Sequence, residues 1–153
     1  MSINKNNIRS KFSLIELISA MSIVVILSGI TIGVYSFIFT KTKNDKTRAV
    51  IIKTEMAMRS YKHDVGYFIQ QPTLGSLTIN TSNREFLKHI DYTRMKNGTE
   101  INANDELIDA WGNPIMYQCP GAHNRTMFDL ISYGKDGANN SGIGDDITNF
   151  TNY

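Results

Sequence analysis

The feature that most constrains this chain is a long apolar segment, residues 12–39, which contains one charged residue, Glu16. A helix needs about 20 predominantly apolar residues to cross a bilayer, so the segment is long enough to span a membrane. A signal peptide is the competing interpretation, but its apolar region is shorter and is followed by a cleavage site of small residues. The sequence therefore predicts a single membrane-spanning helix.

Glu16 is the residue of this segment that needs an explanation. A carboxylate in hydrocarbon costs about 2.5–3.5 kcal/mol even on the most lenient insertion scale. It is tolerated if it has a partner, if the segment leaves the bilayer, or if it lies near an interface. The flanking charges do not predict which way the helix crosses the membrane. Both flanks are basic to nearly the same extent, so the positive-inside rule favours neither orientation. The flanking bases are Lys5, Arg9 and Lys11 before the segment, and Lys41, Lys43, Lys46 and Arg48 after it.

Residues 12–17 read Phe-Ser-Leu-Ile-Glu-Leu, after a short basic leader and at the start of the apolar segment. This pattern resembles the signature of type IV pilins and of their secretion-system relatives, the pseudopilins. In that family a prepilin peptidase cuts before the Phe, the new amine is methylated, and the Glu pairs with the amine of a neighbouring subunit as a filament grows. The resemblance implies a leader peptide at residues 1–11 and a processing site between Lys11 and Phe12. Phe12 and Glu16 would then serve filament assembly.

The helix is expected to continue beyond residues 12–39, with residues 40–66 as its soluble half. Apolar side chains recur there at spacings of three, four and seven residues, which is the pattern of one helix face. They are Val50, Ala57, Met58, Tyr61 and Val65, while Lys53, Glu55, Arg59 and Lys62 lie largely off that face. Gly66 is the expected C-terminal stop of the helix.

Residues 67–153 are expected to form a small globular head. Residues 70–75 contain Pro and Gly, which are typical of turns, and they predict a loop. Ser82, followed three residues later by Glu85, predicts a capping box for a short helix that continues to Ile90.

Two apolar runs in the last third, residues 109–117 and 128–133, predict a β-hairpin with a loop at residues 119–125 between its strands. Trp111 is expected to bury against the helix as a core aromatic side chain. Cys119 is the only cysteine, which excludes an intrachain disulfide and favours a small buried side chain over a nucleophile.

Residues 132–147 are rich in oxygen donors and contain three carboxylates and four glycines. Ca²⁺ takes six to eight oxygen ligands at about 2.3–2.6 Å, and glycines let the backbone curl so that its carbonyls point inward. The spacing is not that of an EF-hand, because Ala138 stands where that motif needs an oxygen ligand. From the residues alone, the loop is either a calcium site or a polar turn whose aspartates cap backbone amides.

Residues 109–147 carry a second resemblance. Asp-x-Trp-Gly-x-Pro, then Pro-Gly, then Phe-Asp-Leu-x-Ser-x-Gly-x-Asp-Gly and finally Asp-Asp-Ile resemble the C-terminal half of the major pseudopilins of type II secretion, which bind one Ca²⁺ in this loop. The resemblance implies that Asp136, Asp145 and Asp146 supply carboxylates and that Tyr133 supplies a backbone carbonyl. The expected fold class is α+β, in which a long N-terminal helix with a membrane-spanning first half packs on a small antiparallel β-sheet with a C-terminal metal-binding loop.

The two resemblances imply a structural filament subunit. In the family, a short periplasmic pseudopilus grows from the inner membrane and helps to export folded proteins. The implied location is the inner membrane, crossed once, with the C-terminal domain in the periplasm. The implied partners are further copies of the chain in a homopolymer, minor pseudopilins, an inner-membrane platform protein, a motor ATPase and a prepilin peptidase.

Two function classes are not indicated. No nucleophile is paired with a base and no three side chains form a metal triad of catalytic type, so an enzyme is not expected. The net charge is +2 and no basic cluster is interleaved with aromatic residues, so nucleic acid is not an expected partner.

Two alternatives stay open. One is a type IV pilus or DNA-uptake pilin, although most such pilins close the C-terminal region differently, often with a disulfide. The other is an unprocessed single-span membrane protein with a calcium-binding domain. Lys11 supports the second alternative, because the family almost always has Gly before the cut, and an uncut chain has no free amine at Phe12.

Overall fold

The computed structural model describes residues 12–79 and 84–151. By its contacts the chain divides into two compact units, residues 1–39 and residues 40–153. Helix α1 spans Leu14–Val65, which confirms the helix predicted from the apolar segment and its soluble continuation.

In the first unit, every described side chain of α1 is exposed, at residues 14–30 and 34–39. Within the part of the chain that the structure describes, α1 is the one helix long and apolar enough to cross a membrane. An exposed apolar surface of this size needs a bilayer or other protein to cover it.

In the second unit, the soluble half of α1 buries the predicted face. Val50, Ala57, Met58 and Tyr61 are buried, and Val65 is partly buried against the same core. The helix ends before Gly66, whose φ is 94°, a conformation that side chains with a Cβ rarely adopt. The Gly66 N–H donates to the Lys62 carbonyl at 2.8 Å, so the predicted stop at this glycine is confirmed.

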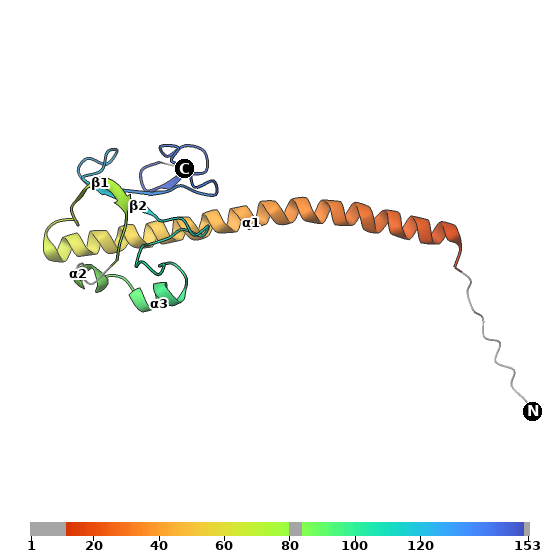
Figure 1. The fold of residues 1–153 in the computed structure, drawn as a ribbon, viewed down its shortest axis with the longest axis horizontal. Helices are drawn as coiled ribbons and strands as arrows, with labels where there is room; N and C mark the ends of the chain where they lie inside the picture. Colours follow the sequence, from red (N-terminus) through yellow and green to blue (C-terminus); the bar gives the residue numbers. More distant parts are fainter. Residues whose placement is uncertain (1–11, 80–83, 152–153) are drawn as a thin grey trace, which may run out of the picture. The chain divides into compact units, whose positions relative to one another are not determined.

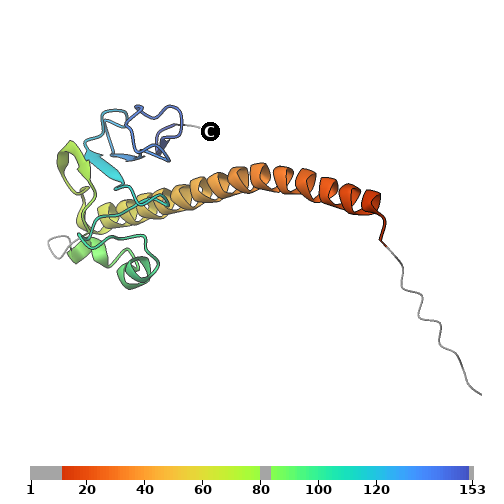
Figure 2. The same cartoon turned by 45° about the vertical axis from the view of Figure 1, so that its right-hand side comes forward.

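Four strands form one antiparallel sheet in the order β1-β2-β3-β4. They are β1 (Gln71–Ser76), β2 (Met116–Cys119), β3 (Asp129–Ser132) and β4 (Ile147–Thr148). β2 pairs with β3, with Tyr117 opposite Leu130, which confirms the predicted hairpin. Its first strand is Met116–Cys119, however, so it begins later than the predicted run at residues 109–117 and includes Cys119, which was expected in the loop. Figures 1 and 2 show the sheet on one side of the soluble half of α1 and two short helices, α2 (Arg84–Leu87) and α3 (Tyr92–Asn97), on the other.

Residues 70–75, predicted to be a loop, lie almost entirely in strand β1, so that prediction is wrong. β1 is at the edge of the sheet, which is where a strand tolerates Pro. Pro72 is exposed there, and the register between β1 and β2 shifts between Gln71 and Gly75. The turn residues therefore mark an irregular edge strand and not a connection.

The predicted short helix is present, but α2 ends at Leu87, before Ile90. Ser82, its predicted cap, lies outside the described residues. The next helix, α3, was not predicted. Its N-cap is Asp91, whose side chain accepts a hydrogen bond from the Arg94 N–H at 3.1 Å. With six residues, α3 is too short to show a recognisable helical period.

The core of the second unit contains a cluster of aromatic rings. Phe68 and Phe128 lie edge to face with ring centroids 4.9 Å apart, and Tyr117 lies 5.7 Å from Phe128. Trp111, predicted to be a core side chain, is only partly buried against this core. Cys119 is buried as predicted, and its burial raises the pKa of the thiol, so it is a poor nucleophile at neutral pH.

Candidate functional site

The predicted assembly residues lie at the N-terminal end of α1. The Glu16 carboxylate accepts a hydrogen bond from the Ser13 N–H at 3.0 Å, and the Glu16 N–H donates to the Ser13 carbonyl at 3.1 Å. The carboxylate thus makes one half of a capping box, in which the third helical residue reaches back to an amide before the helix. Phe12 is 82% exposed, and Lys11 lies outside the described residues.

This cap gives Glu16 a partner within its own chain. The signal was visible in the sequence, because Ser13 is followed three residues later by Glu16 just before an apolar run, but it was not recognised there. The N-terminus of a helix also carries a partial positive charge, which favours a carboxylate. The hydrogen bond uses one carboxylate oxygen and leaves the negative charge in place. The side chain therefore remains suited to a cation as a second partner.

The C-terminal candidate site begins where strand β3 ends. Gly134 has a φ of 62°, and a Cβ at this position would collide with the backbone carbonyl of Asp145. The Gly134 carbonyl accepts a hydrogen bond from the side-chain amide of Asn113 at 2.9 Å, and its N–H donates to Ser132 Oγ at 3.1 Å. Gly134, at the start of the loop, is therefore packed against Asp145 at the loop's end and hydrogen-bonded to Asn113 in the turn before β2.

A buried carboxylate outside the predicted set holds the turn before β2. Asp109 is 4% exposed. Its Oδ1 accepts hydrogen bonds from the Trp111 and Asn113 N–H groups at 2.9 Å, and its Oδ2 accepts one from Ser132 Oγ at 2.8 Å. Asp109 was not singled out from the sequence as a site residue. The turn pattern Asp-Ala-Trp-Gly-Asn is the signal that could have identified it, because Asp commonly binds the amides that follow it.

All three predicted carboxylate ligands organise the backbone of the loop. Asp136 Oδ1 accepts a hydrogen bond from the Ala138 N–H at 2.8 Å, and Asp145 Oδ2 accepts one from the Asp136 N–H at 3.0 Å. Asp146 accepts two more from amides within the loop. The aspartates therefore cap backbone amides, which is what the interpretation of the loop as a polar turn predicts.

Asp146 differs from the other two because one of its oxygens is both buried and unused. The residue is 5% exposed, and its Oδ2 accepts hydrogen bonds from the Asn140 N–H at 2.9 Å and the Gly142 N–H at 2.8 Å. Its Oδ1 is buried and has no hydrogen-bond partner. Such an oxygen is costly, because burial removes its hydrogen bonds to water and no protein donor replaces them.

The phenol of Tyr133, a predicted ligand through its backbone carbonyl, lies in the same surroundings. Its burial, and secondly the nearby charge of Asp146, raise the pKa of the Tyr133 phenol.

The structure does not gather the predicted ligands into a complete coordination shell. Among residues 12–79 and 84–151, no group of three or more His, Cys, Asp or Glu side chains is placed to hold a metal ion. Asp136 and Asp145 are joined through one hydrogen bond, and Asp146 supplies an unpartnered oxygen. The donor set consists of hard oxygen ligands, which suit Ca²⁺. In donor chemistry, and in the oxygen left without a partner, these residues fit Ca²⁺.

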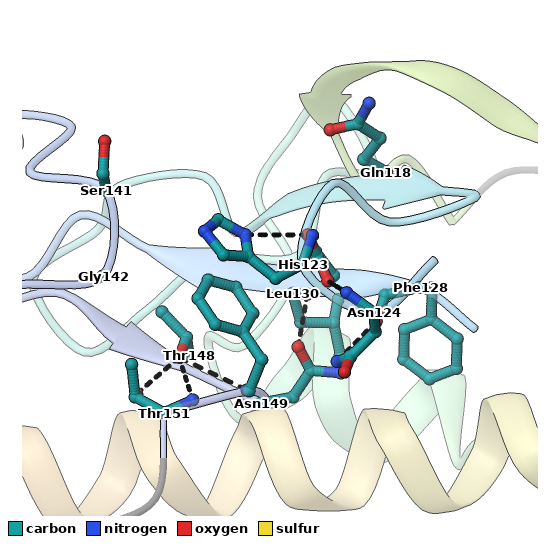
Figure 3. Close-up of polar contacts among 12 residues, drawn as sticks. Gln118, His123, Asn124, Phe128, Leu130, Ser141, Gly142, Thr148, Asn149 and Thr151 are labelled. Atoms are coloured by element: carbon teal, nitrogen blue, oxygen red, sulfur yellow. Dashed lines mark hydrogen bonds and ion pairs between the residues drawn. The ribbon is translucent and has the colours of Figure 1, made fainter. Parts of the chain in front are cut away.

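Polar side chains hold strand β4, which follows the loop, against β3 (Figure 3). Asn149 Oδ1 accepts a hydrogen bond from the Leu130 N–H at 2.8 Å, and its Nδ2 donates to the Phe128 carbonyl at 3.1 Å. The hydroxyls of Thr148 and Thr151 lie 2.6 Å apart. These contacts supplement the ladder of a two-residue strand and fix the C-terminal end of the loop.

Asn149→Ala is expected to lower the free energy of unfolding by about 2 kcal/mol, because the buried Leu130 N–H loses its acceptor. Asn149→Asp keeps that acceptor but places a carboxylate oxygen against the Phe128 carbonyl where the amide donated, so it should also be destabilising. Urea unfolding of the purified chain in detergent, followed by circular dichroism, measures both. An Asn149→Ala variant as stable as the wild type would show that these contacts do not hold β4.

Comparison with known families adds an independent finding. The family model described as type II secretion system (T2SS), protein G, matches residues 38–150, which is well over half of the chain. No curated protein and no solved structure matches the chain. The matched region includes the whole sheet and the C-terminal loop, while Glu16 lies outside it. The chain belongs to the type II secretion system protein G family, the major pseudopilins.

Proposed function

We propose that this chain is the structural subunit of a periplasmic pseudopilus that drives protein export in type II secretion. The observation that carries the proposal is membership of the protein G family, whose members are structural components of the secretion machinery. The apolar part of helix α1 supports it, because its described side chains at residues 14–30 and 34–39 are all exposed and copies of such a surface can cover one another as a filament forms.

Phe12 and Glu16 are the proposed assembly residues. Cleavage between Lys11 and Phe12 gives Phe12 a free amine, which is methylated in the family. The Glu16 carboxylate of one subunit then offsets the charge of that amine in its neighbour, in surroundings where a lone charge is costly. The hydrogen bond from the Ser13 N–H supports this role, because it orients the carboxylate at the end of α1 before a neighbour arrives.

We also assign Ca²⁺ to the C-terminal loop as a resident ion. Asp136, Asp145 and Asp146 would hold it through carboxylates and Tyr133 through its backbone carbonyl. The unpartnered Oδ1 of Asp146 and the hard oxygen donors of the loop support this assignment. The ion supplies positive charge that offsets the repulsion between the carboxylates. The hydrogen bonds from loop amides to the aspartate carboxylates form without the ion. The ion therefore adds stability to a loop that the chain already forms.

The proposed location follows from the same function. The chain crosses the inner membrane once through the apolar part of α1, and residues 40–153 lie in the periplasm. Its partners are further copies of the chain, minor pseudopilins, the inner-membrane platform protein and the prepilin peptidase, with no role for nucleic acid. The apolar segment, which is long enough for one crossing, supports a single span.

The test is coexpression with a prepilin peptidase, followed by N-terminal sequencing and mass measurement of the chain extracted from membranes. We expect a mature chain that begins at Phe12 and has lost the mass of residues 1–11. When the assembly components of a type II system are present, filaments of this chain should appear in the sheared fraction. A chain that still begins at Met1 and never forms multimers contradicts the proposal.

Lys11 favours one competing function, an unprocessed single-span membrane protein with a calcium-binding domain. Lys11→Gly is the matched variant, because it restores the residue usual before the cut. If only the variant is cleaved, Lys11 blocks processing and the competing function is correct. If both chains are cleaved, the wild-type chain can supply the amine that the pseudopilus requires.

A further inference from the structure

The residues that follow the apolar segment in α1 form a group of bases that we call the basic collar. It consists of Lys41, Lys43, Lys46 and Arg48. Asp45 is the one acid among them, so residues 40–48 carry an excess of positive charge. Lys41 and Lys46 are exposed, and neither forms an ion pair with any residue that the structure describes. The charge of these two lysines is therefore directed to solvent or to a partner outside the chain.

An aromatic side chain lies beside the basic collar. The Lys43 ammonium is 6.0 Å from the ring centroid of Trp111, which is partly buried against the core. Trp111 and Lys46 also line a cavity of about 530 Å³ next to α1. An amphipathic ring close to lysines is the combination that proteins place at the headgroup layer of a bilayer.

We propose that the basic collar and Trp111 bind the phosphate groups of anionic phospholipids. Lys41 follows Phe39, the last residue of the apolar segment, by two positions, so it belongs beside the headgroups when that segment is in a bilayer. From Lys41 to Arg48 the helix rises about 10 Å, close to the Debye length of about 8–10 Å. The whole collar therefore lies within electrostatic reach of the surface. Each base near an anionic surface strengthens binding about fivefold.

The distribution of charge along the chain supports a lipid partner in either orientation. Both flanks of the apolar segment are basic. One of the two flanks must therefore lie on the non-cytoplasmic side, where Lys and Arg are usually depleted. Attraction to anionic headgroups offsets that disadvantage. The proposal requires the apolar segment in a bilayer but does not depend on filament assembly.

The test uses the full chain in nanodiscs of phosphatidylcholine with one fifth of the lipid replaced by phosphatidylglycerol. Native mass spectrometry gives the ratio of the two lipids that stay bound when the disc is removed. Emission from Trp111, the only tryptophan, gives a second readout at the proposed site. We expect enrichment of phosphatidylglycerol over its share of the disc, a change in Trp111 emission with phosphatidylglycerol content, and loss of both in high salt.

Lys41→Gln combined with Lys46→Gln should lower the retained ratio of phosphatidylglycerol to phosphatidylcholine by roughly 10- to 30-fold, toward the ratio in the disc, since each lysine contributes about fivefold. The matched control, Lys88→Gln with Arg125→Gln, removes the same charge from two exposed positions outside the collar and should keep the enrichment. Equal loss in both double variants would show that only net charge matters and would overturn the proposal.

Three other outcomes would also overturn it. The first is equal retention of both lipids by the wild-type chain. The second is displacement of phosphatidylglycerol by millimolar soluble glycerol phosphate, which would indicate a site for a free anion. The third is that the lysine variant changes self-association in lipid-free detergent and leaves lipid retention unchanged, which would make the collar a contact between copies of the chain. Thermal unfolding of each variant verifies that the fold is intact.

Discussion

Glu16→Ala is expected to abolish filament assembly while the chain still inserts into the membrane. Membrane insertion should not be weakened, because the variant lacks a carboxylate that costs about 2.5–3.5 kcal/mol in hydrocarbon. In a filament, the amine of the neighbouring Phe12 then has no counter-charge and is itself costly to bury. The measurement is the amount of sheared filament relative to membrane-bound chain, in cells that express the secretion system.

Glu16→Gln is the control that separates charge from capping. The Glu16 side chain accepts a hydrogen bond from the Ser13 N–H, and Gln at the third helical position can do the same. The variant therefore keeps the start of α1 but has no charge to offset an amine. If charge pairing drives assembly, Glu16→Gln should fail as Glu16→Ala does. Wild-type amounts of filament from Glu16→Gln would instead reduce Glu16 to a helix cap.

Helix α1 could be predicted from the sequence because local patterns specify both of its halves. Residues 12–39 are apolar almost without interruption, and residues 40–65 repeat apolar side chains with the helical period. Gly66 then supplies the left-handed conformation that ends a helix. None of these signals depends on the rest of the fold. The hairpin of β2 and β3 was predictable for a similar reason, since its two apolar runs lie close in sequence.

Strand β1 and helix α3 could not be predicted in this way. Residues 70–75 contain Pro72 and Gly75, which favour a turn locally, and they form a strand because β2 offers an unpaired edge there. That edge exists only after the sheet has formed. Helix α3 depends on one capping side chain, Asp91, and on burial of Met95 in the core. A helix this short has no repeating apolar pattern, so the sequence does not reveal the tertiary contacts that stabilise it.

The candidate metal loop was predictable in composition but not in geometry. The sequence identifies three aspartates and four glycines within residues 132–147, and all four glycines have positive φ in the structure. It does not show that Asp146 is buried or that one of its oxygens lacks a partner. It also gives no sign that Asp109, more than twenty residues earlier, holds the start of the loop through Ser132. Those facts depend on packing between distant segments.

Calcium is expected to stabilise the second unit, and Asp146→Asn is expected to remove most of that effect. At a free calcium concentration of about 100 times Kd, a single site adds about 2.7 kcal/mol to the free energy of unfolding. For a unit of this size, that corresponds to a rise in Tm of roughly 10 °C. The measurement is thermal unfolding of the full chain in detergent, with calcium and with a chelator.

Asp146→Asn is informative because it leaves the loop's own hydrogen bonds in place. One side-chain oxygen of Asp146 accepts both the Asn140 and the Gly142 N–H, and the oxygen of an Asn amide can accept both as well. Without calcium, the variant should therefore melt within a few degrees of the wild type. With calcium it should gain little, because the charge that attracts the ion has been removed.

Asp91→Asn is the matched control for this substitution. Asp91 caps α3 by accepting the Arg94 N–H, and Asn caps a helix about as well as Asp. The same chemical change at this position should leave the response to calcium unchanged. If Asp146→Asn also keeps the full response, or if the wild type melts at the same temperature with calcium as with the chelator, the loop is a polar turn that its own amides hold closed. The unpartnered oxygen of Asp146 would then be a cost of folding that no ion relieves.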